Sequence, residues 1–379
     1  MRSVKTKLFS LALAVSMVLA LAGCNMSAPS TVGSIGGVEI PAGIYLMAQY
    51  NAYNTASGVA DLATGETASD VKTVLKAECT GTIGDEEVTA TGSEYVARLT
   101  TRSLEYYAAV EKEFADRNGV LDDAATAEAA NSADSLWSSN GDLYTANGIA
   151  KSTVETYLLN TQKAKALLKM TYGAGGSAPV TDDEYTAYVN DSCYYIEAVQ
   201  FPLMNYSSYT FADDDQKAAI RASAESCLAE LKETATAETA SNSALYTAAM
   251  TYVPQAMSAL GTDMDASQAV YYASSQLYTP DDLASYGSDE YNNLTDPLDE
   301  AGLNNWTSID LGTTILVARR IDPFKTYSVE DLNNMYDLLS DMKSTDLQDD
   351  LYAAGAALEH DLNSSAMNTY SASKIKKNV

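Results

Sequence analysis

Residue types that could carry chemistry are few in this chain of 379 residues, which has one histidine and four cysteines. The histidine, His360, stands between two acidic residues, which favours a solvated position at a helix end. A single imidazole excludes a multi-histidine metal centre and a histidine-based triad in the middle of the chain. No glycine-rich phosphate loop of the Walker or dinucleotide type is present either. We therefore expect no metal site and no cofactor.

Two clusters of aspartate, Asp213–Asp215 and Asp349-Asp350, are candidate calcium ligands. Neither has the alternating ligand spacing and the closing glutamate of an EF-hand loop. Carboxylates also suit the positive end of a helix dipole, so both clusters predict solvated helix starts. Residues 182–184 are explained in the same way.

Cys24 has the most informative surroundings of the four cysteines. Arg2, Lys5 and Lys7 precede an uncharged apolar run over 8–21. The run is shorter than the roughly 20 residues that a membrane-spanning helix needs, and it fits a signal peptide. It ends in Leu-Ala-Gly-Cys, which resembles a bacterial lipobox, although a secretory signal with a chance cysteine is an alternative. The sequence thus predicts cleavage before Cys24, lipid attachment at its thiol and a tether over 24–34.

The formal net charge is −28, and cleavage of residues 1–23 would make it more negative by removing three positive charges. Such an acidic chain lacks the basic face that nucleic-acid binding requires. Anionic bilayers would repel it, so attachment would depend on the lipid. We expect a lipid-anchored protein on the extracytoplasmic face of the cell membrane.

Three cysteines remain after this cleavage: Cys79, Cys193 and Cys227. An odd number allows one disulfide at most, and the sequence leaves open whether any pair forms. Cys227 falls in a helical stretch and Cys193 precedes a strand. Structural, largely inert thiols are the favoured interpretation.

Tyrosine is unusually frequent, with 26 Tyr against 5 Phe and 2 Trp. The pairs Tyr106-Tyr107, Tyr194-Tyr195 and Tyr271-Tyr272 predict one ring towards a core and one outward. Outward rings could hold exposed segments of unfolded proteins, since tyrosine offers apolar area at low entropic cost. Covering of helix junctions is the alternative role for each single ring.

Hydrophobic periodicity and capping residues predict helices at both ends and a mixed module between them. The N-terminal part is expected to contain a hairpin over 35–40, a helix from Pro41, loop and short strand over 56–92, a helix over 93–117 stopped by Gly119, and a helix opened by a capping box at 152–155. The remainder is expected to contain a linker over 173–180, a helix capped at 181–184, strands over 196–201 and 314–321, helices over 214–234 and from Thr279-Pro280, a helix opened at 328–331, and a helical run over 347–358. This order indicates an α+β chain in which an insert interrupts one helical domain.

Several of these segments, in this order, resemble extracytoplasmic chaperones of the SurA/PrsA type. They are the lipobox, the Gly-Val-Glu-Ile strand at 37–40, Asn147-Gly148-Ile149, Tyr172-Gly173, the segment 180–184 and the tail over 368–375. The resemblance implies an N-terminal helical chaperone domain over 35–178, a small parvulin-like α/β module over 179–325, and C-terminal helices over 326–379 that complete the first domain. It also implies that unfolded or nascent secreted proteins are the partners, and it leaves pairing into a homodimer open.

The resemblance further implies a departure from working parvulins. The two strand histidines of that family are matched here by Ala198 and Thr314. A prolyl isomerase must lower a torsional barrier of about 20 kcal/mol by holding the peptide twisted in a hydrogen-bonding apolar pocket. Ala198 offers no side-chain hydrogen bond and Thr314 only a hydroxyl, so we expect isomerase activity to be weak or lost, and no catalytic residue is assigned.

Two alternatives stay open beside this chaperone interpretation. One is an active peptidyl-prolyl isomerase with a rearranged site. The other is a solute-binding lipoprotein of a transporter, which would need two α/β lobes with repeated parallel strands.

Overall fold

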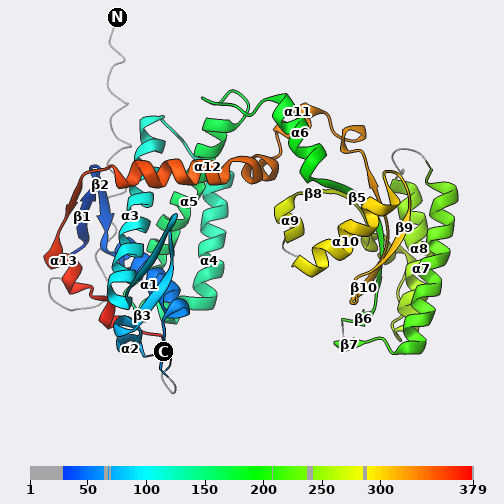
Figure 1. Ribbon diagram of the computed structural model, residues 1–379, viewed down its shortest axis with the longest axis horizontal. Helices are drawn as coiled ribbons and strands as arrows, with labels where there is room; N and C mark the ends of the chain where they lie inside the picture. Colours follow the sequence, from blue (N-terminus) through cyan, green and yellow to red (C-terminus); the bar gives the residue numbers. More distant parts are fainter. Residues whose placement is uncertain are drawn as a thin grey trace, which may run out of the picture. The chain divides into compact units, whose positions relative to one another are not determined.

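The computed structural model describes residues 29–63, 67, 70–206, 208–236, 242–284 and 288–377. This part of the chain is mixed α+β, as predicted, with helices predominating and antiparallel pairing in every described ladder. It divides into two compact units (Figure 1). Unit 1 combines the chain up to Asp116 with Asp122–Gln162 and Tyr352 onward, and unit 2 comprises Arg117–Leu121 and Lys163–Leu351.

The unit boundaries differ from the predicted limits at 178/179 and 325/326. They fall inside two long helices, α5 (Lys151–Tyr172) and α12 (Tyr336–Ala356). The segment predicted as a linker is instead a hydrogen-bonded turn within unit 2. There Ala178 N–H donates to the carbonyl of Thr171 at 2.8 Å, and Val180 N–H donates to that of Tyr172 at 2.9 Å.

A three-stranded sheet in unit 1 joins the two ends of the described chain. Its order is β11-β1-β2, formed by His360–Leu362, Thr31–Ile35 and Val38–Pro41. The turn between β1 and β2 contains two glycines with positive φ, so the predicted hairpin is confirmed. The other elements of this unit are α1 (Ala42–Val59), α2 (Val71–Lys76), β3 (Glu78–Ile83), β4 (Glu86–Thr91), α3 (Gly92–Asp116), α4 (Asp123–Ala146), α13 (Ser364–Thr369) and the 3₁₀ helix η3 (Ala372–Lys374).

C-terminal side chains complete the cores that the N-terminal helices begin. Ala366 packs in one cluster with Val32, Ile40 and Leu104. Ile375 packs in another, together with buried residues of α1, α2 and α3. Unit 1 therefore requires residues from both ends of the described chain.

Some local predictions in unit 1 are wrong. The segment 56–92 holds α2 and the β3–β4 hairpin, and α4 was not anticipated. Helix α3 ends at Asp116 and is followed by Asn118 at φ 54°, so Gly119 is not the stop. Helix α5 begins before Ser152, because Thr153 N–H donates to the Ala150 carbonyl at 2.9 Å. His360 is a strand residue rather than a helix end.

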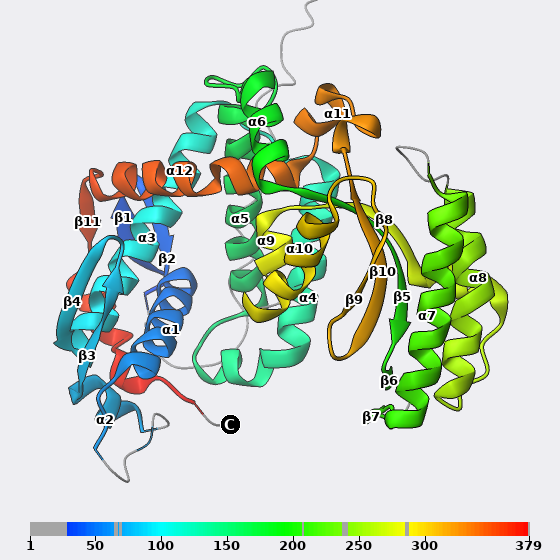
Figure 2. The ribbon, with the colours of Figure 1, turned by 45° about the vertical axis from the view of Figure 1, so that its right-hand side comes forward.

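Unit 2 is built around a four-stranded antiparallel sheet of order β8-β5-β10-β9 (Figure 2). These strands are Ala273–Tyr278, Tyr194–Pro202, Thr314–Ile321 and Thr307–Asp310. The remaining elements are α6 (Asp182–Ser192), β6 (Met204–Asn205), β7 (Thr210–Phe211), α7 (Asp214–Thr234), α8 (Asn242–Ala259), η1 (Ala266–Tyr272), α9 (Pro280–Ala284), α10 (Ser288–Ala301), η2 (Pro323–Lys325) and α11 (Val329–Asn333).

Each face of this sheet is covered by a helical pair, as Figures 1 and 2 show. Val199, Phe201 and Val317 pack against α7 and α8. Ala198 and Leu316, one position along each strand, pack against α9 and α10. Because both faces are buried, β5 and β10 are mostly apolar along their length and do not alternate between apolar and polar residues.

Most predicted elements of unit 2 are confirmed: strands β5 and β10, helix α7, the start of α9 and the capping box between Thr181 and Glu184. The acidic run at Asp213 caps α7 as expected. The helix opened at Ser328 is wrong in length, because it ends at Asn333 and α12 begins at Tyr336. Asp349 and Asp350 consequently lie inside α12 and not at a helix start.

Candidate functional site

The two positions matched to the parvulin histidines lie on the central strands of the unit 2 sheet. Ala198 on β5 is opposite Ala318, whereas Thr314 on β10 is opposite Pro202, so the structure does not bring the two positions together. Ala198 is 3% exposed and packs among the leucines of α9 and α10. The Thr314 hydroxyl donates to the Phe201 carbonyl at 3.1 Å. Neither position presents an acid, a base or a nucleophile to a substrate.

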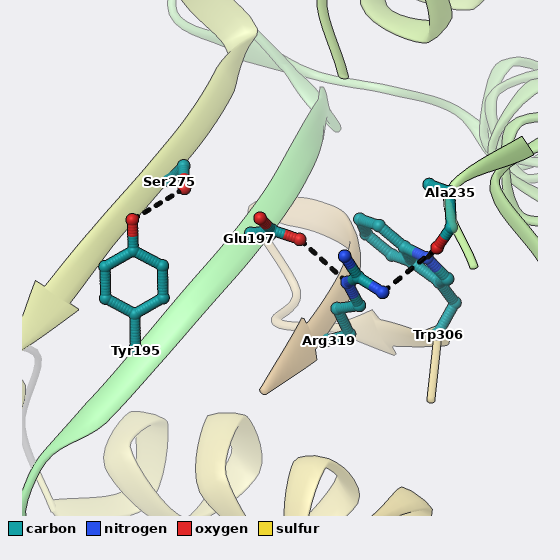
Figure 3. A network of polar contacts seen from close by, with 6 residues as sticks. All are labelled: Tyr195, Glu197, Ala235, Ser275, Trp306 and Arg319. Carbon is teal, nitrogen blue, oxygen red and sulfur yellow. Dashed lines mark hydrogen bonds and ion pairs between the residues drawn. The ribbon is translucent and has the colours of Figure 1, made fainter. Parts of the chain in front are cut away.

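The opposite face of the sheet contains a buried ion pair (Figure 3). Arg319 of β10 and Glu197 of β5 are cross-strand partners, and Nε of Arg319 donates to Oε2 of Glu197 at 2.7 Å. The two residues are 0% and 1% exposed. The guanidinium carbon lies 4.9 Å from the centre of the Trp306 ring. Such a closed cation–π and ion-pair arrangement is out of reach of a substrate.

The same network ties the end of α7 to the sheet. Nη1 of Arg319 and Nε1 of Trp306 both donate to the carbonyl of Ala235, at 3.0 and 3.1 Å. Farther along β5, the Tyr195 hydroxyl and the Ser275 hydroxyl are 3.0 Å apart, linking β5 to β8 (Figure 3). The network satisfies a buried charge and fixes strand register, which is a structural role.

Several exposed aromatic rings belong to the small β6–β7 ribbon that follows β5 and to the end of η1. The most accessible rings are 55%, 79%, 61% and 87% exposed, and they belong to Tyr206, Tyr209, Phe211 and Tyr271. Burial, and secondly the charge of Tyr206, raise the pKa of the Tyr272 phenol, which places those two rings close together. We call these five residues the aromatic surface.

Local hydrogen bonds hold the aromatic surface in place. Ala212 N–H donates to the Leu203 carbonyl at 2.8 Å, closing the ribbon. Nδ2 of Asn205 donates to the Thr262 hydroxyl at 3.1 Å, which joins the ribbon to the segment before η1. Tyr209 adopts φ 53°, a left-handed conformation that is costly for a bulky side chain. The exposed rings therefore lie beside a hydrogen-bonded turn with a strained backbone.

The predicted tyrosine pairs are confirmed only in part. Tyr107 and Tyr195 are buried, but their neighbours Tyr106 and Tyr194 are half-buried. Tyr106 stacks on Tyr352 with ring centres 4.8 Å apart and covers a helix junction, and Tyr194 packs against the core formed with α9 and α10. In the third pair Tyr271 is 87% exposed and Tyr272 is half-buried.

Two cavities in unit 1 flank the C-terminal segment. One has a volume of about 370 Å³ and the other about 310 Å³, and Gln49 and Ser371 line both. Gln49, which lines both cavities, donates from Nε2 to the Tyr45 hydroxyl at 3.0 Å. Hydroxyls, amides and apolar groups form the walls, and no carboxylate, thiol or imidazole belongs to either lining. The larger cavity is also lined by Lys374, which is the one charged side chain among the described residues of the two linings.

All three described cysteines are free and buried. Burial raises the thiol pKa of Cys79, and it raises those of Cys193 and Cys227 to about 12. Thiols held in the protonated form are poor nucleophiles, so the prediction of inert cysteines is supported. Cys24 and the rest of the predicted signal segment lie outside the described residues.

A group of acidic and hydroxyl side chains surrounds Asp341 of α12. Burial raises the pKa of Asp341, a hydrogen bond from Thr279 opposes this, and the charge of Asp281 adds to the rise. Tyr188 of α6 is hydrogen-bonded to the same carboxyl group. Among the described residues, no three or more His, Cys, Asp or Glu side chains are arranged to hold a metal ion. This cluster is therefore an electrostatic feature of unit 2 without an assigned ligand.

His360 makes its main contact with Glu105 of α3, at 3.3 Å from Nε2 to Oε1. Burial raises the pKa of Glu105, and the charges of His360 and Arg102 oppose that rise. The pair joins β11 to α3 and contains no further reactive group. Within the described ranges, none of the helices is both long enough and apolar enough to cross a bilayer.

Sequence reasoning missed the ion pair and most of the aromatic surface, although each had a signal. Glu197 and Arg319 are charges inside otherwise apolar strands, which calls for a buried partner. Tyr209 and Phe211 alternate with hydroxyl residues beside a turn, which is typical of a short ribbon with one aromatic face.

No protein-family model matches the chain, and neither does any curated protein.

Proposed function

We propose that the protein is a lipid-anchored extracytoplasmic chaperone that binds unfolded or nascent secreted proteins, with prolyl isomerase activity weak or lost. The observation that carries this function is the aromatic surface of unit 2, in which four of the five rings are open to solvent on or beside a braced ribbon. Unfolded chains expose apolar side chains, and rigid aromatic rings bind these with little loss of entropy.

Two further features support a chaperone related to parvulin-containing foldases. The strands matched to the first and last strands of a parvulin module, β5 and β10, are neighbours at the centre of the sheet. Between them the histidine positions are taken by Ala198 and Thr314, which lie apart and contact protein. In this proposal the isomerase site lacks its imidazoles, and the central position of β5 and β10 supports a related scaffold.

Aggregation of a reduced client protein measures the proposed activity directly. The purified protein should suppress light scattering by the client, and the triple variant Tyr206→Ser, Tyr209→Ser and Phe211→Ser should lose most of this effect. Tyr246→Ser is the control, because Tyr246 is also exposed, at 41%. Tyr246 lies near the start of α8, about four turns of helix before the segment around Thr262 that is hydrogen-bonded to the ribbon. Equal suppression by the triple variant and the control would refute the assignment to this surface.

Isomerase activity requires a separate measurement. Cis/trans exchange in a proline peptide should proceed in the presence of the protein at close to its uncatalysed rate, since no described side chain replaces the missing imidazoles. Efficient catalysis that is lost on substitution within unit 2 would instead establish an active isomerase.

Membrane anchoring depends on Cys24 in the proposed lipobox. The variant Cys24→Ala should release the protein into the medium or accumulate as an unprocessed precursor, because no thiol is left to accept diacylglycerol. Fractionation of cells into membrane and soluble protein provides the readout. Unchanged membrane retention of the processed variant would contradict the anchor while leaving the chaperone assay unaffected.

A further inference from the structure

The aromatic surface is bordered by carboxylates on both sides. Asp213, Asp214 and Asp215 follow β7 directly, and Asp263 and Asp265 precede the helix η1 that contains Tyr271. All five are exposed. The Asn205–Thr262 hydrogen bond joins the two acidic segments through the ribbon, so both adjoin the same group of rings.

Cations are sparse in the chain around these carboxylates. The sequence has no Lys or Arg between Lys169 and Lys217, and none between Lys232 and Arg319. The nearest Lys and Arg of α7 face Asp310 of β9, where Arg221 Nη2 lies 2.8 Å from a carboxylate oxygen and Lys217 contributes a further attraction. Asp263 and Asp265 therefore have no cation in their own segment, whereas Lys217 follows Asp215 by two residues and also attracts Asp310.

Two of the carboxylates are held by local hydrogen bonds. Hydrogen bonds from the backbone and hydroxyl of Ser267 lower the pKa of Asp265. Asp213 accepts from Gln216 N–H at 2.8 Å as the N-cap of α7. Asp214 and Asp215 lie in the first turn of the same helix.

Rings and carboxylates together favour one kind of binding partner. A Lys or Arg side chain can lay its apolar stem on a tyrosine, place its cationic head over the ring, and reach a carboxylate beside it. A neutral apolar segment gains only the ring contact, and an acidic segment is repelled. The strongly negative chain as a whole adds long-range attraction for basic segments.

On the basis of the chaperone function proposed above, we propose that the aromatic surface selects client segments in which Lys or Arg side chains alternate with apolar ones. Extended basic-aromatic segments are then the substrate class. Acidic segments of the same length and apolar content are rejected.

Binding of three fluorescent peptides to the full processed chain tests this selectivity. The peptides have one length and identical aromatic residues, and they carry Lys, Gln or Glu at the same positions between those residues. Fluorescence anisotropy should give the Lys peptide an affinity about tenfold above that of the Gln peptide at about 50 mM salt, with the Glu peptide weakest. At about 300 mM salt the advantage of the Lys peptide should largely disappear, because exposed charges are screened.

A charge variant, Asp214→Asn with Asp215→Asn and Asp263→Asn, keeps both capping aspartates and should bind the Lys and Gln peptides equally. The matched control removes three exposed carboxylates elsewhere in unit 2, by Glu233→Gln, Asp296→Asn and Glu300→Gln, and should keep the preference. An equal loss in the control would mean that net charge alone is responsible, and would overturn the inference.

The peptides also separate this inference from the function on which it depends. Equal affinity for the Lys and Gln peptides, with aggregation still suppressed, would overturn the charge selectivity and leave the chaperone function standing. No binding of any peptide, together with no suppression of aggregation, would overturn both.

Discussion

Units 1 and 2 secure their cores in different ways. Unit 1 assembles distant parts of the chain: β1 pairs with β11, and the Tyr370 hydroxyl donates to the carbonyl of Pro29 at 2.5 Å. Most of unit 2 is one continuous stretch, and its sheet contains the buried Glu197–Arg319 pair. The first unit depends on backbone junctions between chain ends, and the second on satisfying a buried charge.

This difference determines where each unit is most sensitive. A backbone junction fails when a side chain no longer fits, whereas a buried ion pair fails when one partner is left alone. Substitutions at the two places should therefore destabilise one unit and spare the other, which unfolding followed by probes in each unit can resolve.

The largest effect is expected at Arg319. Arg319→Met leaves Glu197 charged and buried, and it should lower the free energy of unfolding of unit 2 by about 3 to 5 kcal/mol. Chemical denaturation measures this loss. Arg221→Met removes the exposed pair with Asp310 and should cost less than about 1 kcal/mol. A similar small loss for Arg319→Met would show that the buried pair does not hold the sheet.

A double variant, Glu197→Leu with Arg319→Met, sharpens the same comparison. Removal of both charges leaves no isolated ion in the core, so most of the stability lost in the single variant should return. Failure to recover would point to the Ala235 and Trp306 contacts as the main contribution of Arg319.

An intermediate effect is expected at Gly33 in unit 1. Gly33 has φ 117°, and an added Cβ would lie only 2.2 Å from the Asp361 carbonyl oxygen of β11. Gly33→Ala should destabilise unit 1 by about 2 kcal/mol or more, through strain and separation of the strands. Gly37→Ala is the control, since Gly37 has φ 80° with nothing within 4 Å of the added Cβ, and should cost about 1 kcal/mol. Equal losses in urea denaturation would mean that the β1–β11 junction tolerates the side chain.

The smallest effect concerns Asp341 and depends on pH. Its pKa is raised in the folded state, so folding retains a proton that the unfolded chain releases, and stability falls as pH rises from the unfolded pKa through the folded one. The groups that interact with the Asp341 carboxyl are Asp281, Thr279, Tyr188 of α6 and Cys193. The charges of Asp282 and Arg320 also act on the Cys193 thiol.

Asp341→Asn should therefore stabilise unit 2 at about pH 7, by less than about 1 kcal/mol because Asp341 is only partly buried, and the gain should vanish towards about pH 3. Urea midpoints across this range measure the effect. A gain that grows on acidification would have the wrong sign and would contradict the raised pKa.

Sequence patterns predicted the mixed α+β class and the elements with strong local signals. Thr314–Ile321 was identified as a strand because both of its faces are apolar, and Thr181 and Asp213 mark helix starts through their own side chains. Helix α4 was missed because it buries mainly small residues, such as Ala129 and Ala133, which leave no apolar stripe.

The candidate site was less accessible to sequence reasoning. The aromatic surface depends on a hydrogen bond from Asn205 to Thr262, more than fifty residues apart, and no periodicity encodes it. Tyr271 was noticed only as half of a pair. Likewise, the sequence around Ala198 and Thr314 resembles the family strands, but the strand register that separates the two residues is a tertiary property.

The pairing of β1 with β11 also sets an order of events during synthesis. A chain made from its N-terminus presents β1 early, and that strand lacks β11 on its far side until residues 360–362 follow. Unit 2 can close before then, since its final residue is Leu351. Unit 2 would thus complete its fold first, and unit 1, which began first, would close last.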